Sequence, residues 1–319
     1  MKLKTTILFC LLFVNFYLSA QDNETQYKKV DEFVNSMGPL TDKNVSTIAD
    51  TLTRGLGSKE LKARAIFFWI ANNIALDAKA IKSNDNRKTL PEEVVKNRKT
   101  TALGFAKLFQ EMSSIANIRC LVVDGFVKNT VEEINDPADE VNHSWNVLQL
   151  GQSPEQWYYI DAAKASGTLD KKMSGFVKDF TGEYFFADRI LFNLDHFPDN
   201  DAWQLGPGPK SKNEFYALPV LYNAAYTYGI KKLAPATGFI KTKVDAKLIF
   251  NIAYTSPKSI GSVSLLIGDG RKPIKPEPMN FTSSNGAITF TYQFKVEDSF
   301  PVRVQVNENT VLEYMVEVN

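Results

Sequence analysis

The sequence has few of the residues that build disulfide-held or metal-held scaffolds: two cysteines and two histidines among 319 residues. Two cysteines are too few for a disulfide-dense scaffold, and two histidines are too few for a histidine-rich metal cage. Neither sign of charge is in excess, with 37 Lys+Arg against 36 Asp+Glu and no long basic run. Because neutralising phosphates takes a concentrated basic surface, this argues against nucleic acid as the main partner. No metal and no other cofactor is expected.

What is present is typical of a globular protein. The hydrophobic fraction of 44% and the charged fraction of 23% argue against disordered, collagen-like and coiled-coil chains. The length predicts roughly two domains.

The first twenty residues have the pattern of a secretory signal peptide. Lys2 and Lys4 precede an apolar run at residues 7–14, and the small residues Ser19 and Ala20 follow. The run is shorter than the about 20 residues that span a bilayer, and no later stretch is long enough. We predict cleavage after Ala20 and a secreted or periplasmic mature protein without a transmembrane segment.

Helical patterns come first and strand patterns follow, which predicts an α+β domain. Ser58 is a plausible N-cap for a helix running to about residue 74, Pro91 opens a shorter helix, and a third begins near Thr101. Short apolar or aromatic runs at residues 120–123, 145–148 and 157–160 predict strands.

A second pattern follows the turn-rich segment at residues 206–209. Strands are expected at residues 248–254, 263–267, 288–294, 302–306 and 311–318, separated by turn signals at 268–270 and at Asn285-Gly286. This predicts an all-β, immunoglobulin-like sandwich. The expected parts are the signal peptide at 1–20, the α+β domain at 21–205, a bridging segment at 206–234 and the sandwich at 235–319.

Three segments together resemble the transglutaminase-like superfamily, a branch of the papain-like cysteine-peptidase fold. They are the helix at residues 65–74 followed by Asp77, the segment 98–109, and the pair formed by 142–147 and 157–161. They stand in the order of the family's opening helix, nucleophile, and His and Asp. The resemblance covers a core of about residues 45–170 and implies a transglutaminase-like, papain-like domain.

In the family, a Cys at a helix start, a His and an Asp carry out acyl transfer. The helix dipole and the imidazolium favour the thiolate, the His moves the proton, and the Asp orients the His. The resemblance assigns these positions to Ala102, His143 and Asp161. Ala102 has no heteroatom, so no acyl intermediate can form on it. The chain also departs from the family at residues 162–164, where a Pro-Thr-Trp run is usual, and at Leu76, where Tyr is common.

Other residues are weaker candidates for chemistry. Thr101 is rotated by about 100° from the next helix position, and an internal Thr lacks the free amine that activates threonine nucleophiles. Cys120 lies in an apolar strand pattern and is expected to be a buried, inert thiol. His196 is interpreted as a structural loop residue, and the nearby acids, including Asp195, as part of a solvated turn.

These patterns predict an exported, catalytically inactive transglutaminase-like protein that binds a protein or peptide as a scaffold. The ligand is expected between the helix beginning near Thr101 and the sheet carrying His143, with Thr101, Trp145 and Asn142 as contacts. Residues 195–204 and 214–220 also resemble muscle and cytokinesis relatives, often regarded as scaffolds. The alternative is an active acyl transferase or amidase with a non-standard nucleophile. A third hypothesis assigns the interaction to the sandwich. The sequence predicts neither the ligand's identity nor the oligomeric state.

Overall fold

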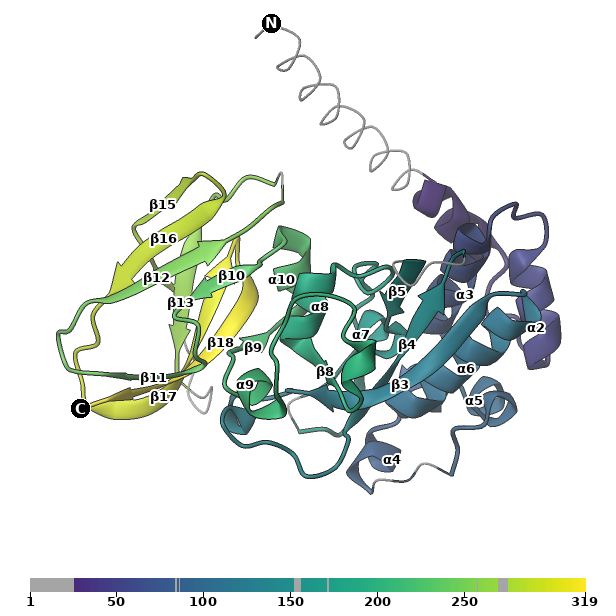
Figure 1. Cartoon of the computed structure of the whole chain (residues 1–319), viewed down its shortest axis with the longest axis horizontal. Helices are drawn as coiled ribbons and strands as arrows, with labels where there is room; N and C mark the ends of the chain where they lie inside the picture. The colour runs from purple at the N-terminus through teal and green to yellow at the C-terminus, as the bar shows by residue number, and fades with distance from the viewer. Residues whose placement is uncertain are drawn as a thin grey trace, which may run out of the picture. The chain divides into compact units, whose positions relative to one another are not determined.

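A computed structural model describes residues 26–83, 85, 87–151, 156–170, 172–256, 258–268 and 275–319 (Figure 1). The predicted signal peptide and most of the predicted turn at 268–270 lie outside these residues. Internal contacts divide the chain into two units, residues 1–122, 148–157 and 161–185 in the first and residues 123–147, 158–160 and 186–319 in the second.

The first unit is mainly helical. Residues 26–36 are helical, and the further helices are α2 (Val45–Thr53), α3 (Lys59–Asn73), α4 (Ala78–Lys82), α5 (Pro91–Asn97), α6 (Ala102–Ile115) and α7 (Ala162–Ser166). Two short ladders also belong to it, β1 (Ala75–Leu76) with β2 (Lys99–Thr100) and β6 (Gly167–Leu169) with β7 (Phe176–Lys178).

The sequence signals for the starts of these helices are confirmed. The Ser58 side chain accepts a hydrogen bond from the Leu61 backbone N–H and caps α3. Pro91 is the first residue of α5, where its missing N–H removes no helical hydrogen bond. Thr101 is the N-cap residue of α6, so Ala102 is the first residue of that helix.

A four-stranded sheet has the order β5-β4-β3-β8. Its strands are β3 (Arg119–Val127), β4 (His143–Gln149), β5 (Trp157–Ile160) and β8 (His196–Pro198). The three strands predicted between residues 120 and 160 are therefore confirmed. The fourth replaces the loop expected at His196, and that expectation is wrong: α8 (Arg189–Asp195) leads directly into β8, which pairs antiparallel with β3.

The C-terminal region is a β-sandwich, as predicted. One sheet has the order β10-β12-β16-β15 and the other β11-β18-β17-β13-β14. The strands are β10 (Lys232–Ala234), β11 (Phe239–Thr242), β12 (Leu248–Ala253), β13 (Val263–Ile267), β14 (Glu277–Pro278), β15 (Phe281–Ser284), β16 (Ala287–Tyr292), β17 (Asp298–Val306) and β18 (Asn309–Val318).

The sandwich core comes from alternate residues of facing strands. Phe250 of β12 stacks on Phe290 of β16, with ring centroids 4.7 Å apart, and meets Tyr314 of β18 edge to face at 5.7 Å. The rings belong to both sheets and are buried, so they join the two layers. The predicted turn at Asn285-Gly286 connects β15 to β16, with φ of 52° and 70° at the two residues.

The segment between the predicted domains also contributes to the sheets. It contains α9 (Lys212–Tyr216), β9 (Val220–Leu221) and α10 (Asn223–Tyr228). β9 pairs with β18, and β10 pairs with β12. The predicted boundaries at residues 20, 205 and 234 stay predictions.

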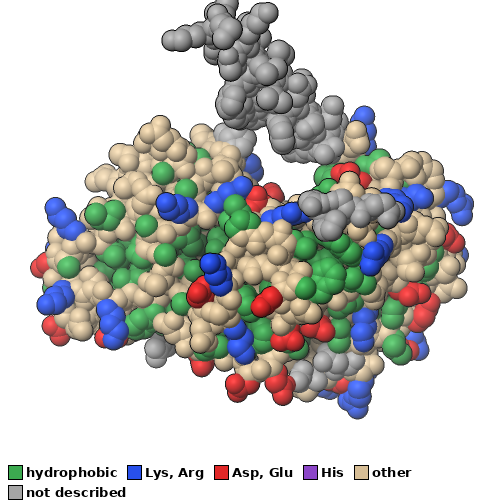
Figure 2. Space-filling model, viewed as in Figure 1, with side chains coloured by type: hydrophobic (Ala, Val, Ile, Leu, Met, Phe, Trp, Pro, Cys, Tyr) green, Lys and Arg blue, Asp and Glu red, His purple; other side chains and the backbone are tan. Residues whose placement is uncertain are grey.

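Charge is spread over the face drawn in Figure 2, where basic and acidic side chains are interspersed. This distribution fits the near-zero net charge. Among the helices of the described chain, none combines the length and the apolar character that crossing a bilayer requires.

Candidate functional site

The position assigned to the nucleophile lies at the start of a helix. Thr101 has an extended backbone, with φ −84° and ψ 171°, and α6 runs on from Ala102 for 14 residues. The N-terminus of such a helix carries partial positive charge and favours a thiolate placed there. Ala102 offers only a methyl group to this environment.

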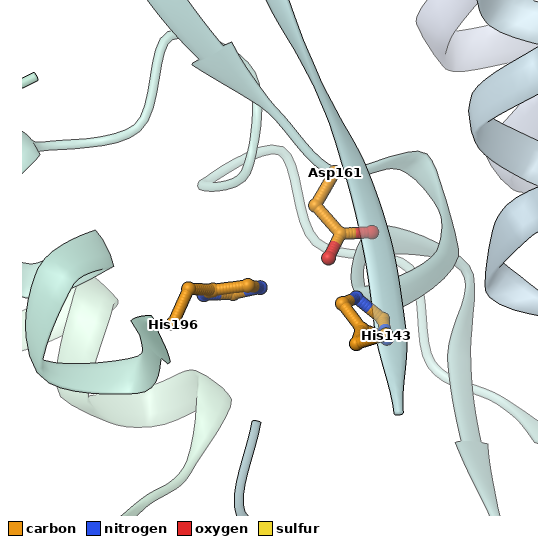
Figure 3. A group of neighbouring side chains, drawn as sticks. All are labelled: His143, Asp161 and His196. Carbon is orange, nitrogen blue, oxygen red and sulfur yellow. The ribbon is translucent and has the colours of Figure 1, made fainter. Parts of the chain in front are cut away.

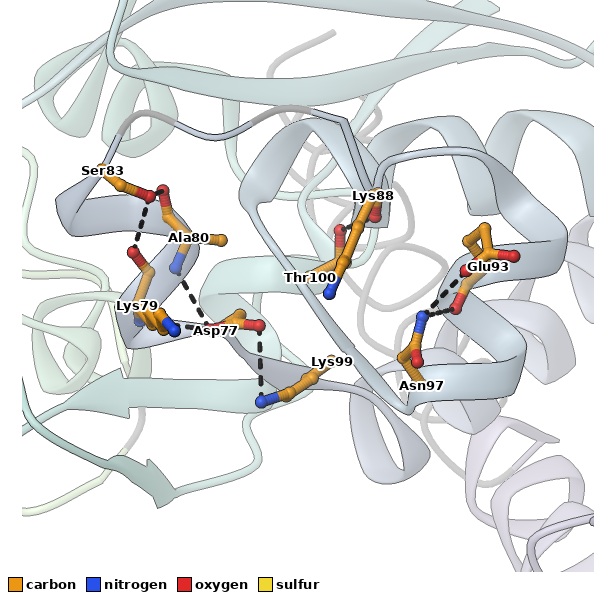
Figure 4. Close-up of polar contacts among 9 residues, drawn as sticks. All are labelled: Asp77, Lys79, Ala80, Ser83, Lys88, Glu93, Asn97, Lys99 and Thr100. Carbon is orange, nitrogen blue, oxygen red and sulfur yellow. Dashed lines mark hydrogen bonds and ion pairs between the residues drawn. The ribbon is translucent and has the colours of Figure 1, made fainter.

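The two threonines before Ala102 are buried. Thr100 is 2% exposed and Thr101 8% exposed. The Thr100 hydroxyl donates a hydrogen bond to the backbone carbonyl of Lys88 at 3.1 Å (Figure 4). Lys99 forms an ion pair with Asp77 at 3.5 Å, which ties β2 to the start of α4. This hydrogen bond and this ion pair hold in place the segment that leads into α6.

His143 is the first residue of β4 and is half-buried. Its ring lies 6.4 Å from the ring of Trp145 and 5.4 Å from the ring of His196. Trp145 is 1% exposed and is therefore a core residue. Asn142 is exposed, and its amide accepts from the Val127 N–H at 2.9 Å and donates to the Val127 carbonyl at 3.0 Å. The ligand-binding roles of Trp145, Asn142 and Thr101 stay predictions.

Asp161 follows the last residue of β5 and caps α7. One carboxylate oxygen accepts a hydrogen bond from the Lys164 backbone N–H at 2.8 Å, and the residue is 1% exposed. Its own N–H donates to the Tyr184 carbonyl at 3.0 Å. These bonds hold the carboxylate at the end of the strand.

The structure groups His143 and Asp161 with a residue that the sequence analysis interpreted as structural. One ligand atom each from His143, Asp161 and His196 all lie within 4.8 Å of one another. In Figure 3 the three side chains point toward one another. His196 is therefore an addition to the candidate site.

His196 packs among aromatic rings and lies beside an acid. It is 1% exposed, and its ring stacks on Phe192 with a centroid distance of 3.8 Å and an interplanar angle of 7°. Trp145 meets it edge to face at 5.2 Å. Its Nδ1 lies 3.5 Å from a carboxylate oxygen of Asp195, which also accepts a hydrogen bond from the Tyr226 hydroxyl at 3.2 Å.

The expectation of a solvated turn at Asp195 is wrong, because this residue is 4% exposed. In the sequence, the resemblance of residues 195–204 to the muscle and cytokinesis relatives indicated that this segment is of interest. That resemblance assigned no role to any of its residues. Cys120 is buried in β3, as expected for a thiol in an apolar strand pattern.

Comparison with known proteins supports the resemblance. Residues 46–162 match the model of the transglutaminase-like superfamily. The chain is 30% identical over 197 residues to kyphoscoliosis peptidase of Mus musculus, which covers 61% of this chain and 29% of that protein. The human kyphoscoliosis peptidase is 28% identical, covering 73% of this chain and 34% of the relative.

A relative from Schizosaccharomyces pombe, cytokinesis protein 3, is 23% identical, covering 79% of this chain and 28% of that protein. The chain thus spans about a third or less of the length of these relatives. The matches to kyphoscoliosis peptidase and to a cytokinesis protein confirm the predicted family resemblance. We conclude that residues 46–162 of this chain form a domain of the transglutaminase-like superfamily.

Proposed function

We propose that this protein is an exported, catalytically inactive transglutaminase-like protein that binds a protein or peptide ligand. The observation that carries the proposal is Ala102 at the first position of α6. This is the helix start to which the family resemblance assigns the nucleophile.

Without a heteroatom at that position the acyl-transfer cycle has no first step. A His and an Asp can move and stabilise a proton, but covalent catalysis needs a nucleophile that the base activates. His143 and Asp161 would then persist for geometry or binding and not for turnover.

The local contacts argue against a replacement nucleophile. The Thr100 hydroxyl already donates to the Lys88 carbonyl, so its proton is held by a backbone acceptor. Thr101 is buried at the helix cap and is not a chain terminus. Cys120 is buried within β3, and a thiol in apolar surroundings is a poor nucleophile because burial disfavours its thiolate.

Two observations support peptide binding: the names of the relatives and the absence of a nucleophile at position 102. A relative named as a peptidase acts, by its name, on peptide bonds, and another is named for cytokinesis. Loss of the nucleophile removes bond cleavage but leaves the side chains that recognise a peptide. Export is proposed from Lys2, Lys4 and the apolar run at 7–14, and intact mass of the exported chain would then show a start at Gln21.

The first test is an activity assay on the mature protein. We expect neither amide hydrolysis nor transamidation of glutamine-containing peptides, while equilibrium binding to a peptide array gives saturable hits. Turnover that is abolished by His143→Ala would overturn the proposal. Such turnover, with a covalent adduct on Thr100, Thr101 or Cys120 in mass spectra, would establish the alternative enzyme.

The second test restores the missing thiol. Ala102→Cys in a Cys120→Ser background places one thiol at the start of α6, and Glu111→Cys in the same background places one on its exposed middle. Alkylation rates against pH should give a thiol pKa below about 8.5 at position 102 and an ordinary one at position 111. Equal values at the two positions would contradict a preserved catalytic frame.

A further inference from the structure

One edge of the sandwich lacks the residues that usually protect the edge of a sheet. Within the described residues, the two sandwich sheets end in the strands β10 and β15 and in the strands β11 and β14. An unpaired edge is a template for another strand, and proteins commonly block it with lysine or proline. β10 contains Lys232, β11 contains Lys241 and β14 contains Pro278. β15, with the sequence Phe-Thr-Ser-Ser, contains neither.

The hairpin at this edge is also uncharged. No Lys, Arg, Asp or Glu occurs at residues 279–294, which include β15, β16 and the turn between them, although 23% of the chain is charged. Figure 1 shows β15 as the outermost strand of its sheet, and Thr282, Ser283 and Ser284 are exposed. We propose that β15 pairs antiparallel with β15 of a second copy of this chain, so that two sandwiches share one continuous sheet.

The turn determines which backbone groups of β15 face outward. The two-residue turn at Asn285-Gly286 makes Ser284 and Ala287 a hydrogen-bonded pair, and such pairs alternate with non-hydrogen-bonded ones along an antiparallel ladder. The N–H and C=O groups of Phe281 and Ser283 therefore point away from β16. Among the described strands, β16 alone pairs with β15, so these outward groups can bond to an added strand.

A symmetric register pairs all of these outward groups. With the two-fold axis at Thr282, Phe281 of each copy lies opposite Ser283 of the other, and each such pair exchanges two N–H···O=C bonds. Thr282 then lies opposite its counterpart in the second copy. This central pair is of the non-hydrogen-bonded kind, in which the Cα atoms are about 4.5 Å apart and two threonine side chains stabilise the pairing.

The chemistry of the hairpin favours a second copy of this chain as the occupant of the edge. Two identical charged strands would place like charges opposite each other, and this strand has no charge. Serine and threonine hydroxyls both donate and accept hydrogen bonds, so identical strands are complementary. The same row of the sheet continues inward from Thr282 to Thr289, whose hydroxyl oxygen accepts from the Asn251 amide at 2.8 Å. Because a short edge buries little surface, the dimer should be weak and concentration-dependent.

Sedimentation equilibrium of the mature chain in a Cys120→Ser background tests the association. The average mass should rise from one chain toward two as the concentration approaches about 1 mM. A mass of one chain over the whole range would overturn the proposal and leave the edge to a strand of a different protein.

A charge placed on the edge tests whether β15 forms the interface. Thr282→Lys puts two ammonium groups opposite each other at the two-fold axis and should keep the chain monomeric up to about 1 mM. The matched control is Thr291→Lys, an exposed threonine of β16 one strand further in, which should associate as the parent does. With folding verified by circular dichroism, equal association of the two variants would overturn the assignment of β15.

A disulfide tests the register. Thr282→Cys in the Cys120→Ser background should form a covalent dimer on oxidation, because Cα atoms about 4.5 Å apart are within the range of a disulfide. Thr291→Cys should not, since the β16 strands of the two copies would lie three strand spacings, about 14 Å, apart. Equal yields of covalent dimer from the two variants, or none from Thr282→Cys, would contradict the proposed pairing.

Discussion

At the scale of single residues, two arginine–aspartate pairs have similar geometry and different burial. Arg64 donates from Nε and Nη2 to Asp31 at 2.9 and 2.7 Å, and Arg87 donates from the same atoms to Asp85 at 2.7 Å each. The Arg64 side chain is 7% exposed and the Arg87 side chain 87%. Solvent screens the exposed pair, so its contribution to stability is small.

We expect Arg64→Ala to lower the free energy of unfolding by about 3 kcal/mol. The change leaves Asp31 with a poorly solvated charge, and it removes the guanidinium from the rings of Tyr27, Phe67 and Phe185, whose centroids lie 5.2 to 5.3 Å from it. Urea unfolding measures the difference. Arg87→Ala is the matched control and should leave the midpoint unchanged. Equal effects of the two variants would show that burial is not the deciding factor.

At the scale of elements, α6 contains a glycine whose replacement by Ala should be unfavourable despite helix propensity. A Cβ on Gly104 would meet the Thr100 hydroxyl oxygen at 1.9 Å and its methyl carbon at 2.7 Å. Thr100 is buried and bonded to Lys88, so it cannot swing away without losing that bond. The close approach of Gly104 to Thr100 therefore fixes the segment that leads into Ala102.

We expect Gly104→Ala to destabilise the protein by about 1–2 kcal/mol, although Ala is favoured in helices by about 1 kcal/mol. Combining it with Thr100→Ala should recover part of the loss, since the clashing atoms are then absent, and a double-mutant cycle from urea unfolding gives the coupling. Gly57→Ala, where a Cβ meets nothing within 4 Å, is the control. A stabilising effect of Gly104→Ala alone would contradict the packing argument.

Elements with local signals could be predicted from the sequence. Ser58 and Pro91 mark helix starts by chemistry that acts within one turn. The strand runs near 120, 145 and 157 are apolar or aromatic. The pattern failed at α8 and β8. β8 is three residues long, and its place is set by pairing with β3, about 70 residues earlier in the chain. Tertiary packing on Phe192 and Trp145 buries His196, and no local pattern predicts it.

The same distinction applies to the candidate site. Ala102, His143 and Asp161 were assigned by motif order, and the structure places Ala102 at the predicted helix start. The third member of the group in Figure 3, His196, comes from the element that local patterns missed. Side chains brought together by strand pairing across a sheet are therefore the part of the site that a single sequence does not disclose.

At the scale of the whole molecule, tyrosines link stability to alkaline pH. Burial raises the pKa of Tyr159 to about 12, and burial also raises the pKa of Tyr314 and of Tyr222, where the nearby Glu313 adds to the effect. Tyr292 has its pKa raised to about 12 by burial and by its hydrogen bond to Glu277. All four belong to the second unit, which includes the sandwich.

Folding stability should therefore fall as the pH rises from about 10 through 12. In the unfolded chain these tyrosines lose their protons near pH 10, whereas the folded chain retains them, so above that pH the unfolded state binds fewer protons and is favoured. Below about pH 10 both states are protonated and the contribution is constant. Tyr159 alone accounts for about 3 kcal/mol once the pH exceeds both values, because its pKa rises from 10.0 to about 12 on folding. Urea unfolding at a series of pH values, read with tyrosinate absorbance, measures how steeply the free energy of unfolding falls with pH.

The Tyr159→Phe variant should make this fall less steep, because it removes one of the ionising hydroxyls. It should also lower the free energy of unfolding at neutral pH by about 1–3 kcal/mol, because the Tyr159 hydroxyl accepts from the Leu205 N–H at 2.5 Å and donates to Asn193 at 2.8 Å. A free energy of unfolding that stays constant from about pH 9 to 12 would mean that these hydroxyls ionise as readily in the folded chain as in the unfolded one.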